Sequence, residues 1–345
     1  MEFSYHPHLL EYKFPFGVSS NTRTHTQSVF VKIEWDGFTG YGEACLPPYL
    51  GDTLEKTTEL FDKAKRILKQ QTYPCSIAEI ILEIDELDDD ANAAKAAIDI
   101  ALHDLKGKIE KKSIQQLYRL NPVRSAKTAC TIGIDKEEVI KQKIEDASAF
   151  DVLKIKAGTH DDKALIELIR KYTNKPLYVD VNQGWKSKEE ALELMHFFKE
   201  KNVVLIEQPM PVDRIDDMAF LTQQNILPVF ADESVKRLSD LQNLNGAFNG
   251  INIKLMKCTG IKEAFEMIEL AKELNLKVFL GCMAESSCAT SAMAQFIGCA
   301  DYIDLDAPYL LKNDPFEGVS YKNGEVVLAD LPGIGANPNR SILDI

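Results

Sequence analysis

From about Thr128 onward, short apolar runs alternate with amphipathic stretches at a steady interval, a pattern typical of strands separated by helices. The runs predict eight strands: Thr128–Gly133, Val152–Lys156, Leu177–Val181, Val203–Glu207, Pro228–Asp232, Gly250–Lys254, Lys277–Gly281 and Tyr302–Asp306. Intervening helices favour parallel pairing, most economically in a closed barrel, with a doubly wound open sheet as the alternative. Too few residues follow the eighth strand for another full helix. We therefore predict an α/β fold built on a modified (β/α)7β, TIM-like barrel.

The first third of the chain has a different pattern, in which strands precede helices. Residues 28–34 and 38–43 flank Asp36-Gly37, a strong hairpin signal. Helical periodicity follows over residues 54–69, 77–87 and 92–107. We expect the Ala-rich third helix to end at Gly107. Together these elements predict an α+β capping domain.

The end of the chain carries a second hairpin signal, centred on Asn323-Gly324. A hairpin that follows a completed barrel needs another surface to pack on, and we expect it to dock on the capping domain. The predicted division is residues 1–125 for the capping domain, 126–317 for the barrel and 318–345 for a C-terminal segment that returns to the cap. No low-complexity linker separates these parts, so we expect them to pack tightly.

Composition narrows the class of protein. The 345 residues carry 40 Lys and Arg against 53 Asp and Glu, a formal net charge of −13, which argues against nucleic acid or an anionic membrane as a partner. The apolar runs are shorter than a membrane span needs, and the N-terminus has no signal-peptide pattern. Seven cysteines without a CxxC motif favour free thiols in the cytoplasm. The histidines show no metal spacing, and we expect His6 and His8 to lie in an exposed tail.

Charged residues end most of the predicted barrel strands. They are Lys154, Lys156, Asp180, Glu207, Asp232, Lys254, Asp304 and Asp306. Active sites of such barrels lie at the C-terminal ends of the strands. The pattern therefore predicts one charged cluster at one rim of the barrel.

The carboxylates of Asp180, Glu207 and Asp232 come from three successive strands. Three such groups would repel each other unless a cation lay between them. A ligand set made only of oxygen atoms favours Mg²⁺ over Zn²⁺. We predict one Mg²⁺ on these residues. The alternative is that some of them cap the following helices.

The lysines flank this predicted metal site. Lys154 and Lys156 are two positions apart on one strand and point to the same face, whereas Lys254 ends a strand on the far side of the three carboxylates. Burial near other cations lowers the pKa of a lysine and makes it a usable base. Their apolar neighbours argue against a surface position.

Two alternative functions come from other classes of protein. One is a Schiff-base aldolase, in which a buried lysine is the nucleophile, and the other is a barrel retained only for binding.

Five motifs together resemble the enolase superfamily, in its muconate-lactonizing subgroup. The motifs are the KxK of Lys154 and Lys156, the segments DVNQGW from Asp180, IEQP around Glu207 and ADES around Asp232, and NIKLMK around Lys254. The Asp304-Leu305-Asp306 segment is similar to the DxD of dipeptide epimerases, in which it receives the substrate's α-ammonium group. The resemblance covers nearly the whole chain.

The resemblance implies a mechanism that fits the predicted geometry. Mg²⁺ would bind the carboxylate of a dipeptide and stabilise the enediolate formed when the α-proton leaves. Lys156 and Lys254 would act on opposite faces of the α-carbon, and Lys154 would bind the carboxylate. The expected activity is a 1,1-proton transfer on L-Ala-D/L-Glu in murein peptide metabolism. A cycloisomerase or o-succinylbenzoate synthase-type lyase and an epimerase of hydrophobic dipeptides remain alternatives.

Specificity is expected to come from the capping domain. The resemblance implies a flexible loop over residues 17–26, in which Arg23 would bind the side-chain carboxylate of Glu; an exposed loop arginine is the alternative. We expect Thr131, Cys282 and Glu285 to line the substrate pocket. Family members often assemble into homo-oligomers, and the sequence does not determine the oligomeric state.

Overall fold

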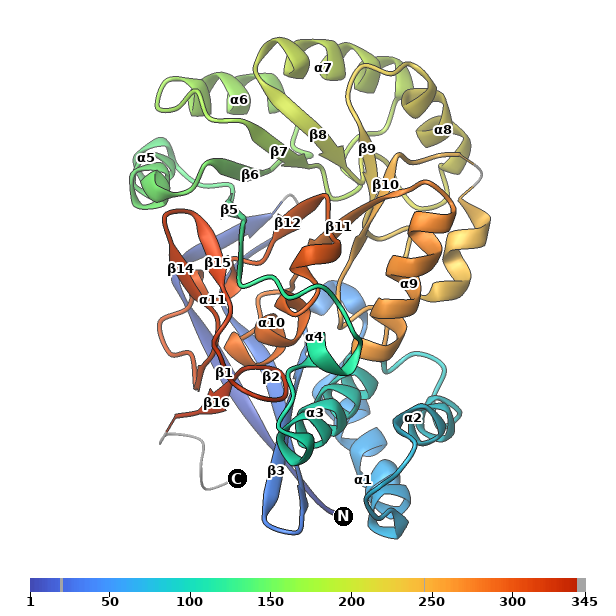
Figure 1. The fold of residues 1–345 in the computed structure, drawn as a ribbon. Coiled ribbons are helices and arrows are strands. Elements are labelled where there is room, and N and C mark those ends of the chain that lie inside the picture. The colour runs from blue at the N-terminus through green and yellow to red at the C-terminus, as the bar shows by residue number, and fades with distance from the viewer. Residues whose placement is uncertain (19–20, 245, 340–345) are drawn as a thin grey trace.

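The computed structural model describes residues 1–18, 21–244 and 246–339. Its larger part is a barrel of eight parallel strands that pair in sequence order, and the last strand lies beside the first (Figure 1). The strands are β5 (Ala129–Ile132), β6 (Val152–Lys156), β7 (Leu177–Asp180), β8 (Val203–Glu207), β9 (Val229–Ala231), β10 (Gly250–Ile253), β11 (Lys277–Gly281) and β12 (Tyr302–Asp304). The predicted barrel is confirmed, and each strand lies within its predicted range.

Helices cover the outside of the barrel between successive strands (Figure 1). They are α5 (Glu137–Asp146), α6 (Asp162–Arg170), α7 (Lys188–Glu200), α8 (Ile215–Gln223), α9 (Ile261–Glu273) and α10 (Ser287–Ala294). The connection after β9 differs from the others, because its described residues contain a 3-10 helix, η3 (Leu238–Asn243), in place of an α-helix. After β12, the short α11 (Ala307–Leu310) is the only α-helix among the described residues, so the barrel has seven crossovers and then a final strand.

The barrel interior has an apolar layer below its charged rim. Ala129, Tyr178, Leu205, Phe230 and Phe279 form a buried cluster there. Phe230 and Phe279 meet edge to face, with ring centroids 5.8 Å apart. Strand residues two apart share a face, so the position two after each of these residues also points inward and lies nearer the rim.

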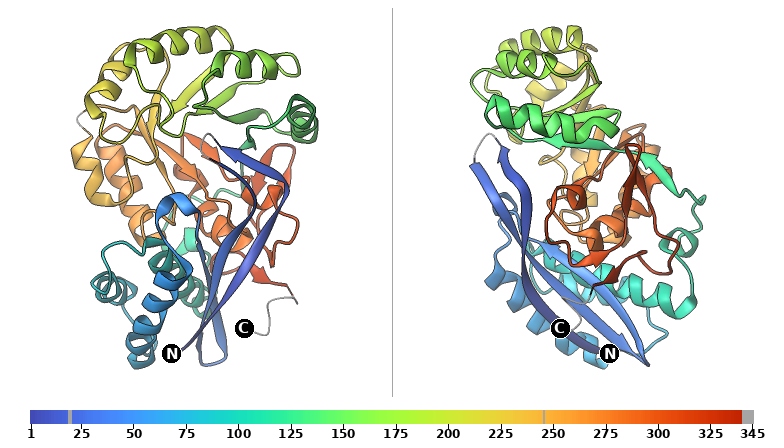
Figure 2. Two further views of the ribbon diagram at one scale, coloured as in Figure 1. Left: turned by 180° about the vertical axis from the view of Figure 1, so that it is seen from behind. Right: turned by 90° about the vertical axis from the view of Figure 1, so that its left-hand side faces the viewer.

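The capping domain is built on a three-stranded antiparallel sheet of β1 (Glu2–Val18), β2 (Asn21–Trp35) and β3 (Phe38–Cys45). The β2–β3 hairpin is confirmed: Asp36 and Gly37 both have positive φ, at 48° and 78°, as the predicted turn requires. Figure 2 shows the long β1–β2 hairpin running from the cap helices up to the barrel. The helices are α1 (Leu54–Gln70), α2 (Ile77–Asp85), α3 (Asn92–Glu110) and α4 (Ile114–Leu117).

The expectation of an exposed N-terminal tail is wrong. His6 and His8 lie in β1, paired with Phe30 and Ser28 of β2. His8 is only partly exposed, and its ring lies 5.7 Å from that of Phe30. The hydrogen bonds of the neighbouring strand hold this segment in place, and the local sequence does not reveal that partner.

The C-terminal segment contacts both parts of the molecule. The predicted hairpin is present as β14 (Ser320–Lys322) and β15 (Glu325–Val327), with β15 paired to β4 (Ser125–Lys127), which directly precedes β5. Farther along, β16 (Asn337–Pro338) pairs with β13 (Phe316–Glu317), whose Phe316 ring lies 5.2 Å from that of Phe30 in the cap. The three-part domain division stays a prediction. In the described parts of the chain, no helix is both long and apolar enough to cross a bilayer.

The third cap helix does not end at Gly107. It continues to Glu110 and ends at Lys111, which adopts φ 54°. Gly107 has another function: a Cβ there would lie 2.5 Å from the Cα of Gly333, so this glycine allows the C-terminal segment to pack directly on the helix. At this position, close packing against Gly333 therefore requires glycine, although glycine has a low helix propensity.

We expect Gly107→Ala to destabilise the protein by about 1–3 kcal/mol, the usual cost of overpacking. The substitution raises helix propensity by roughly 1 kcal/mol, so a gain of stability would contradict this account. Urea unfolding measures the change. Lys106→Ala, on the same helix turn, is the control and should shift the free energy of unfolding by less than about 0.5 kcal/mol.

Candidate active site

Three carboxylates meet at the C-terminal ends of adjacent strands. Asp180 ends β7, Glu207 ends β8 and Asp232 directly follows β9. Each offers one oxygen, and these three atoms all lie within 4.8 Å of one another. Register places them together, because Asp180 pairs with Glu207 across the parallel strands. All three side chains are buried.

This group has the chemistry of a site for a hard divalent cation. Its donors are all carboxylate oxygens, which suit Mg²⁺, and no His or Cys belongs to it. Burial, and next the charge of Asp180, raise the pKa of Glu207 to about 7. A cation among these oxygens would offset both effects. The three residues therefore fit the predicted metal.

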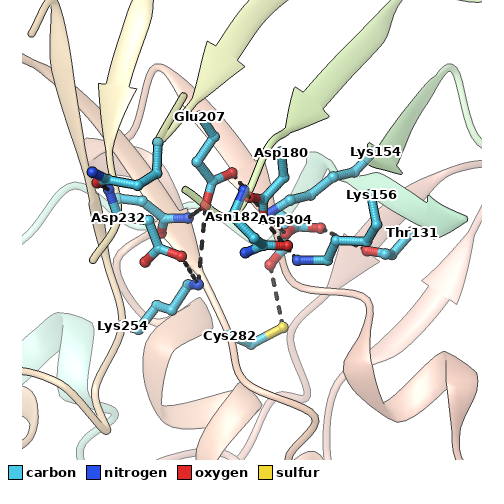
Figure 3. Close-up of polar contacts among 12 residues, drawn as sticks. Thr131, Lys154, Lys156, Asp180, Asn182, Glu207, Asp232, Lys254, Cys282 and Asp304 are labelled. Atoms are coloured by element: carbon cyan, nitrogen blue, oxygen red, sulfur yellow. Dashed lines mark hydrogen bonds and ion pairs between the residues drawn. The ribbon is translucent and has the colours of Figure 1, made fainter. Parts of the chain in front are cut away.

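Two lysines approach the carboxylates from opposite sides, as Figure 3 shows. Lys156 Nζ lies 2.7 Å from Asp180 Oδ2, and Lys254 Nζ lies 2.7 Å from Asp232 Oδ2. Both side chains also line the cavity above the carboxylates. A molecule bound there would have one ammonium group on each side.

Lys154 lies lower, between the carboxylates. Its Nζ is 2.8 Å from Glu207 Oε2, 2.8 Å from Asp304 Oδ2 and 3.2 Å from Asp180 Oδ2. Burial by itself would lower the pKa of Lys154, but Asp304, Glu207 and Asp180 together raise it well above its ordinary value. The sequence-based expectation of a lowered pKa therefore does not hold for Lys154. A permanent cation suits carboxylate binding better than proton transfer.

A second acidic pair lies across the cavity, at and just after the end of β12. Asp304 and Asp306 are both nearly fully buried and line the cavity. Thr131 joins them: its backbone N donates to Asp306 Oδ2 at 2.5 Å, and its hydroxyl donates to both aspartates. Burial, and then the charge of Asp304, raise the pKa of Asp306 to about 7. Cys282 completes this wall by donating its thiol to the Asp304 carbonyl at 3.2 Å.

The cavity has a volume of about 260 Å³ and lies between the barrel rim and the cap. Arg23 lines it from β2, and its buried Nε and Nη1 atoms have no hydrogen-bond partner among the residues that the structure describes. The segment around Arg23 is the end of the β1–β2 hairpin, since Phe16 pairs with Arg23 and Gly17 with Thr22. The described residues of the expected flexible loop over 17–26 thus lie in the two strands of this hairpin, and Ser19 and Ser20 lie outside the described residues. The flexibility of this segment stays a prediction.

Glu285 does not line this cavity, contrary to expectation. Its side chain is 1% exposed and accepts a hydrogen bond from the backbone N of Met283. Its neighbours Met283 and Ala284 do face the cavity. The turn after β11 therefore directs Glu285 away from the site. Burial, and then the nearby Glu43, raise its pKa well above the ordinary value.

Other residues at the site are not singled out by the sequence. Asn252 donates to Glu207 Oε1 at 2.7 Å, and Lys257 Nζ lies 2.6 Å from Asp232 Oδ1. Several further residues line the cavity: Tyr12, Phe16, Asn182, Gln183 and Glu233. Tyr12 and Phe16 belong to β1, the strand mistaken for a tail. For Asn182 and Gln183 a signal exists, because both follow a barrel strand directly, where functional loops begin.

A capped barrel with an acidic triad between opposed lysines defines the class of protein. The chain belongs to the enolase superfamily: residues 138–342 match the family described as "Enolase C-terminal domain-like", and residues 4–118 match "Mandelate racemase / muconate lactonizing enzyme, N-terminal domain". The first match covers the barrel from α5 onward, and the second covers most of the cap.

Within this family the chain is similar to dipeptide epimerases. It is 48% identical over 336 residues to the L-Ala-D/L-Glu epimerase of Bacteroides thetaiotaomicron, covering 97% of this chain and 87% of that protein. A substrate-liganded structure of the L-Ala-D/L-Glu epimerase from Bacillus subtilis superposes with a TM-score of 0.91 at 27% identity, covering 98% and 99% of the two chains. A dipeptide epimerase from Enterococcus faecalis, complexed with Mg and L-Leu-L-Tyr, gives 0.91 at 30% identity over 97% and 99%.

We expect Mg²⁺ to raise the melting temperature of the protein, since a ligand that binds only the folded state stabilises it. Glu207→Gln and Asp232→Asn should each remove most of this increase, which differential scanning fluorimetry with and without EDTA measures. Glu137→Gln, at an exposed carboxylate on α5, is the matched control and should keep the full increase. An undiminished increase in both triad variants would place the metal elsewhere.

Proposed function

We propose that this protein is a Mg²⁺-dependent dipeptide epimerase that inverts the α-carbon of the C-terminal residue, with L-Ala-D/L-Glu as its substrate. The observation that carries the proposal is the placement of Lys156 and Lys254 on opposite sides of the acidic triad. Inversion requires that a proton leave one face of the α-carbon and another arrive on the opposite face. A single base would not supply both steps.

The proton transfers follow from this geometry. When bound on Asp180, Glu207 and Asp232, Mg²⁺ supplies positive charge to the substrate's carboxylate and so makes the α-proton more acidic. Lys154, held as a cation by its acidic neighbours, binds the same carboxylate. One of Lys156 and Lys254 accepts the α-proton on its Nζ, and the other donates a proton from its Nζ to the opposite face. The reverse reaction exchanges their roles.

Two further groups support a dipeptide as the substrate. The carboxylates of Asp304 and Asp306 lie together at one side of the cavity and match an α-ammonium group. A cycloisomerase or lyase substrate without an ammonium group would leave this pair unmatched. Arg23 faces the cavity with two buried nitrogen atoms, Nε and Nη1, that have no partner in the described part of the chain, which matches a side-chain carboxylate such as that of Glu. This is the reason for preferring L-Ala-D/L-Glu over a hydrophobic dipeptide.

The cellular setting is also part of the proposal. L-Ala-D-Glu units occur in murein peptides, so we place the activity in their turnover. The seven cysteines of the chain are all free thiols, which supports a reducing, cytoplasmic location.

L-Ala-L-Glu incubated in D₂O with Mg²⁺ should gain deuterium at the Glu α-carbon and give L-Ala-D-Glu. We expect Lys156→Ala and Lys254→Ala each to reduce epimerisation by at least about 10²–10⁴-fold, the usual contribution of a general base. Lys188→Ala, at a lysine of α7 outside the cavity, is the control. Proton NMR follows the exchange. Near-normal epimerisation in either variant would exclude the two-base mechanism.

Arg23→Ala should lower kcat/KM for L-Ala-L-Glu by about 10–100-fold, equivalent to losing a charge-assisted hydrogen bond of about 1.5–3 kcal/mol. With L-Ala-L-Leu the same variant should differ from the wild type by less than about threefold, because that side chain has no carboxylate. Steady-state kinetics with the two dipeptides checks this, with Arg124→Ala as the control. Equal losses on both substrates would show that Arg23 does not recognise Glu.

A further inference from the structure

Glu43, a buried residue of the cap, has no part in the proposed reaction, yet it contacts the barrel closely. Its side chain is 0% exposed. Two groups of Ser286 donate to Glu43: the backbone N to Oε1 at 3.0 Å and the hydroxyl to Oε2 at 2.6 Å. The backbone N of Ala289 donates to Glu43 Oε2 at 3.3 Å. Within the cap, the hydroxyl of Ser28 donates to Oε1 at 2.8 Å. Most of the hydrogen-bond donors to Glu43 thus belong to the barrel.

The barrel groups that Glu43 binds lie at the beginning of α10. The first N–H groups of a helix have no partner within the helix, and its N-terminus attracts negative charge. The hydroxyl of Ser286 already caps α10 by accepting from Cys288 N. Glu43 provides a second cap, which comes from the other domain.

The turn before this helix forms one wall of the active-site cavity. Only residues 282–286 separate β11 from α10, and Cys282, Met283 and Ala284 line the cavity. The strand holds one end of the turn, and Glu43 holds the other end at Ser286. Cys282 also donates to the carbonyl of Asp304. The position of this turn therefore affects the side of the cavity formed by Asp304 and Asp306, which is proposed to bind the α-ammonium group.

A second carboxylate of the cap binds the preceding barrel helix in the same way. Asp99 on α3 accepts from the backbone N–H groups of Ile261, at 2.5 Å, and Lys262, at 3.3 Å, at the start of α9. The N-cap residue of that helix is Gly260, which has no side chain to provide a cap. Helix α9 follows the strand that leads to Lys254. The capping domain therefore provides hydrogen-bond acceptors for the N-termini of both α9 and α10, the helices that follow β10 and β11.

We propose that Glu43 is a positioning residue: by capping α10 from the cap domain, it holds the Cys282–Ser286 turn in the position that binds the dipeptide. This inference rests on the proposed function. If Glu43 holds the turn, substrate affinity depends on the position of the capping domain on the barrel. The lysines and the acidic triad lie on other strands and keep their geometry.

The test uses the full-length protein with Mg²⁺ and L-Ala-L-Glu. Glu43→Gln keeps the size of the side chain but turns an amide N–H₂ group toward N–H donors. Ser286→Ala removes the hydroxyl that donates to Glu43 and that also accepts from Cys288 N. The matched control is Asp85→Asn, which breaks a different contact between the domains: Asp85 on α2 binds Arg237 at 2.8 Å, beside η3 and away from the cavity lining. The measurements are KM, kcat and amide hydrogen exchange of the peptide spanning 282–290.

We expect Glu43→Gln to raise KM about 10-fold with kcat within about threefold, Ser286→Ala to raise KM about threefold, and both to speed amide exchange in 282–290. Asp85→Asn should leave KM and this exchange within twofold of the wild type. Unchanged KM and exchange in Ser286→Ala and any folded Glu43→Gln would overturn the proposal, as would an equal effect of Asp85→Asn. If the wild type does not turn over L-Ala-L-Glu, the proposed function fails, and amide exchange alone then decides whether Glu43 holds the turn.

Discussion

The mutual neutralisation of buried acids and lysines at the barrel rim is the interaction on which the rest of the site depends. Asp180, Glu207 and Asp232 lie almost fully buried, and Lys154 and Lys254 are buried with them. An unpaired buried charge costs several kcal/mol, so neither set would be tolerated in this interior without the other. Each lysine lies within 3.0 Å of at least one carboxylate oxygen. The pairing also fixes side-chain positions, and a site that transfers protons between defined faces needs that rigidity.

The strands place this charged layer by simple alternation. Tyr178 and Asp180, Leu205 and Glu207, and Phe230 and Asp232 are each two residues apart, so every pair puts an apolar side chain below a carboxylate. The apolar layer keeps water from reaching the carboxylates through the barrel. Within such a low-dielectric setting the attraction between lysine and carboxylate is stronger than at a surface. The same periodicity therefore provides both the core and the chemistry.

The cap completes the site in two ways that the barrel does not provide. Arg23 and Tyr12 close the cavity from the β1–β2 hairpin. Glu43 and Asp99 bind the starts of α10 and α9, which follow β11 and β10. These contacts join two separately patterned parts of the chain through buried hydrogen bonds to side-chain carboxyl groups. The proposed substrate-binding residues thus come from both domains, whereas the proposed proton-transfer groups all belong to the barrel.

The sequence by itself determined the barrel, its eight strands and the residues of the charged rim, because strand periodicity and polar strand ends are local signals. The resemblance to the enolase superfamily then added roles to these positions. The sequence did not reveal β1, whose strand conformation depends on pairing with β2, or the continuation of α3 through Gly107, which depends on packing against Gly333. It also placed Glu285 in the pocket, although the turn after β11 directs that side chain into the protein. Only the tertiary structure decided these points, because the direction of a side chain in a turn and the partner of a strand are set by contacts distant in the sequence.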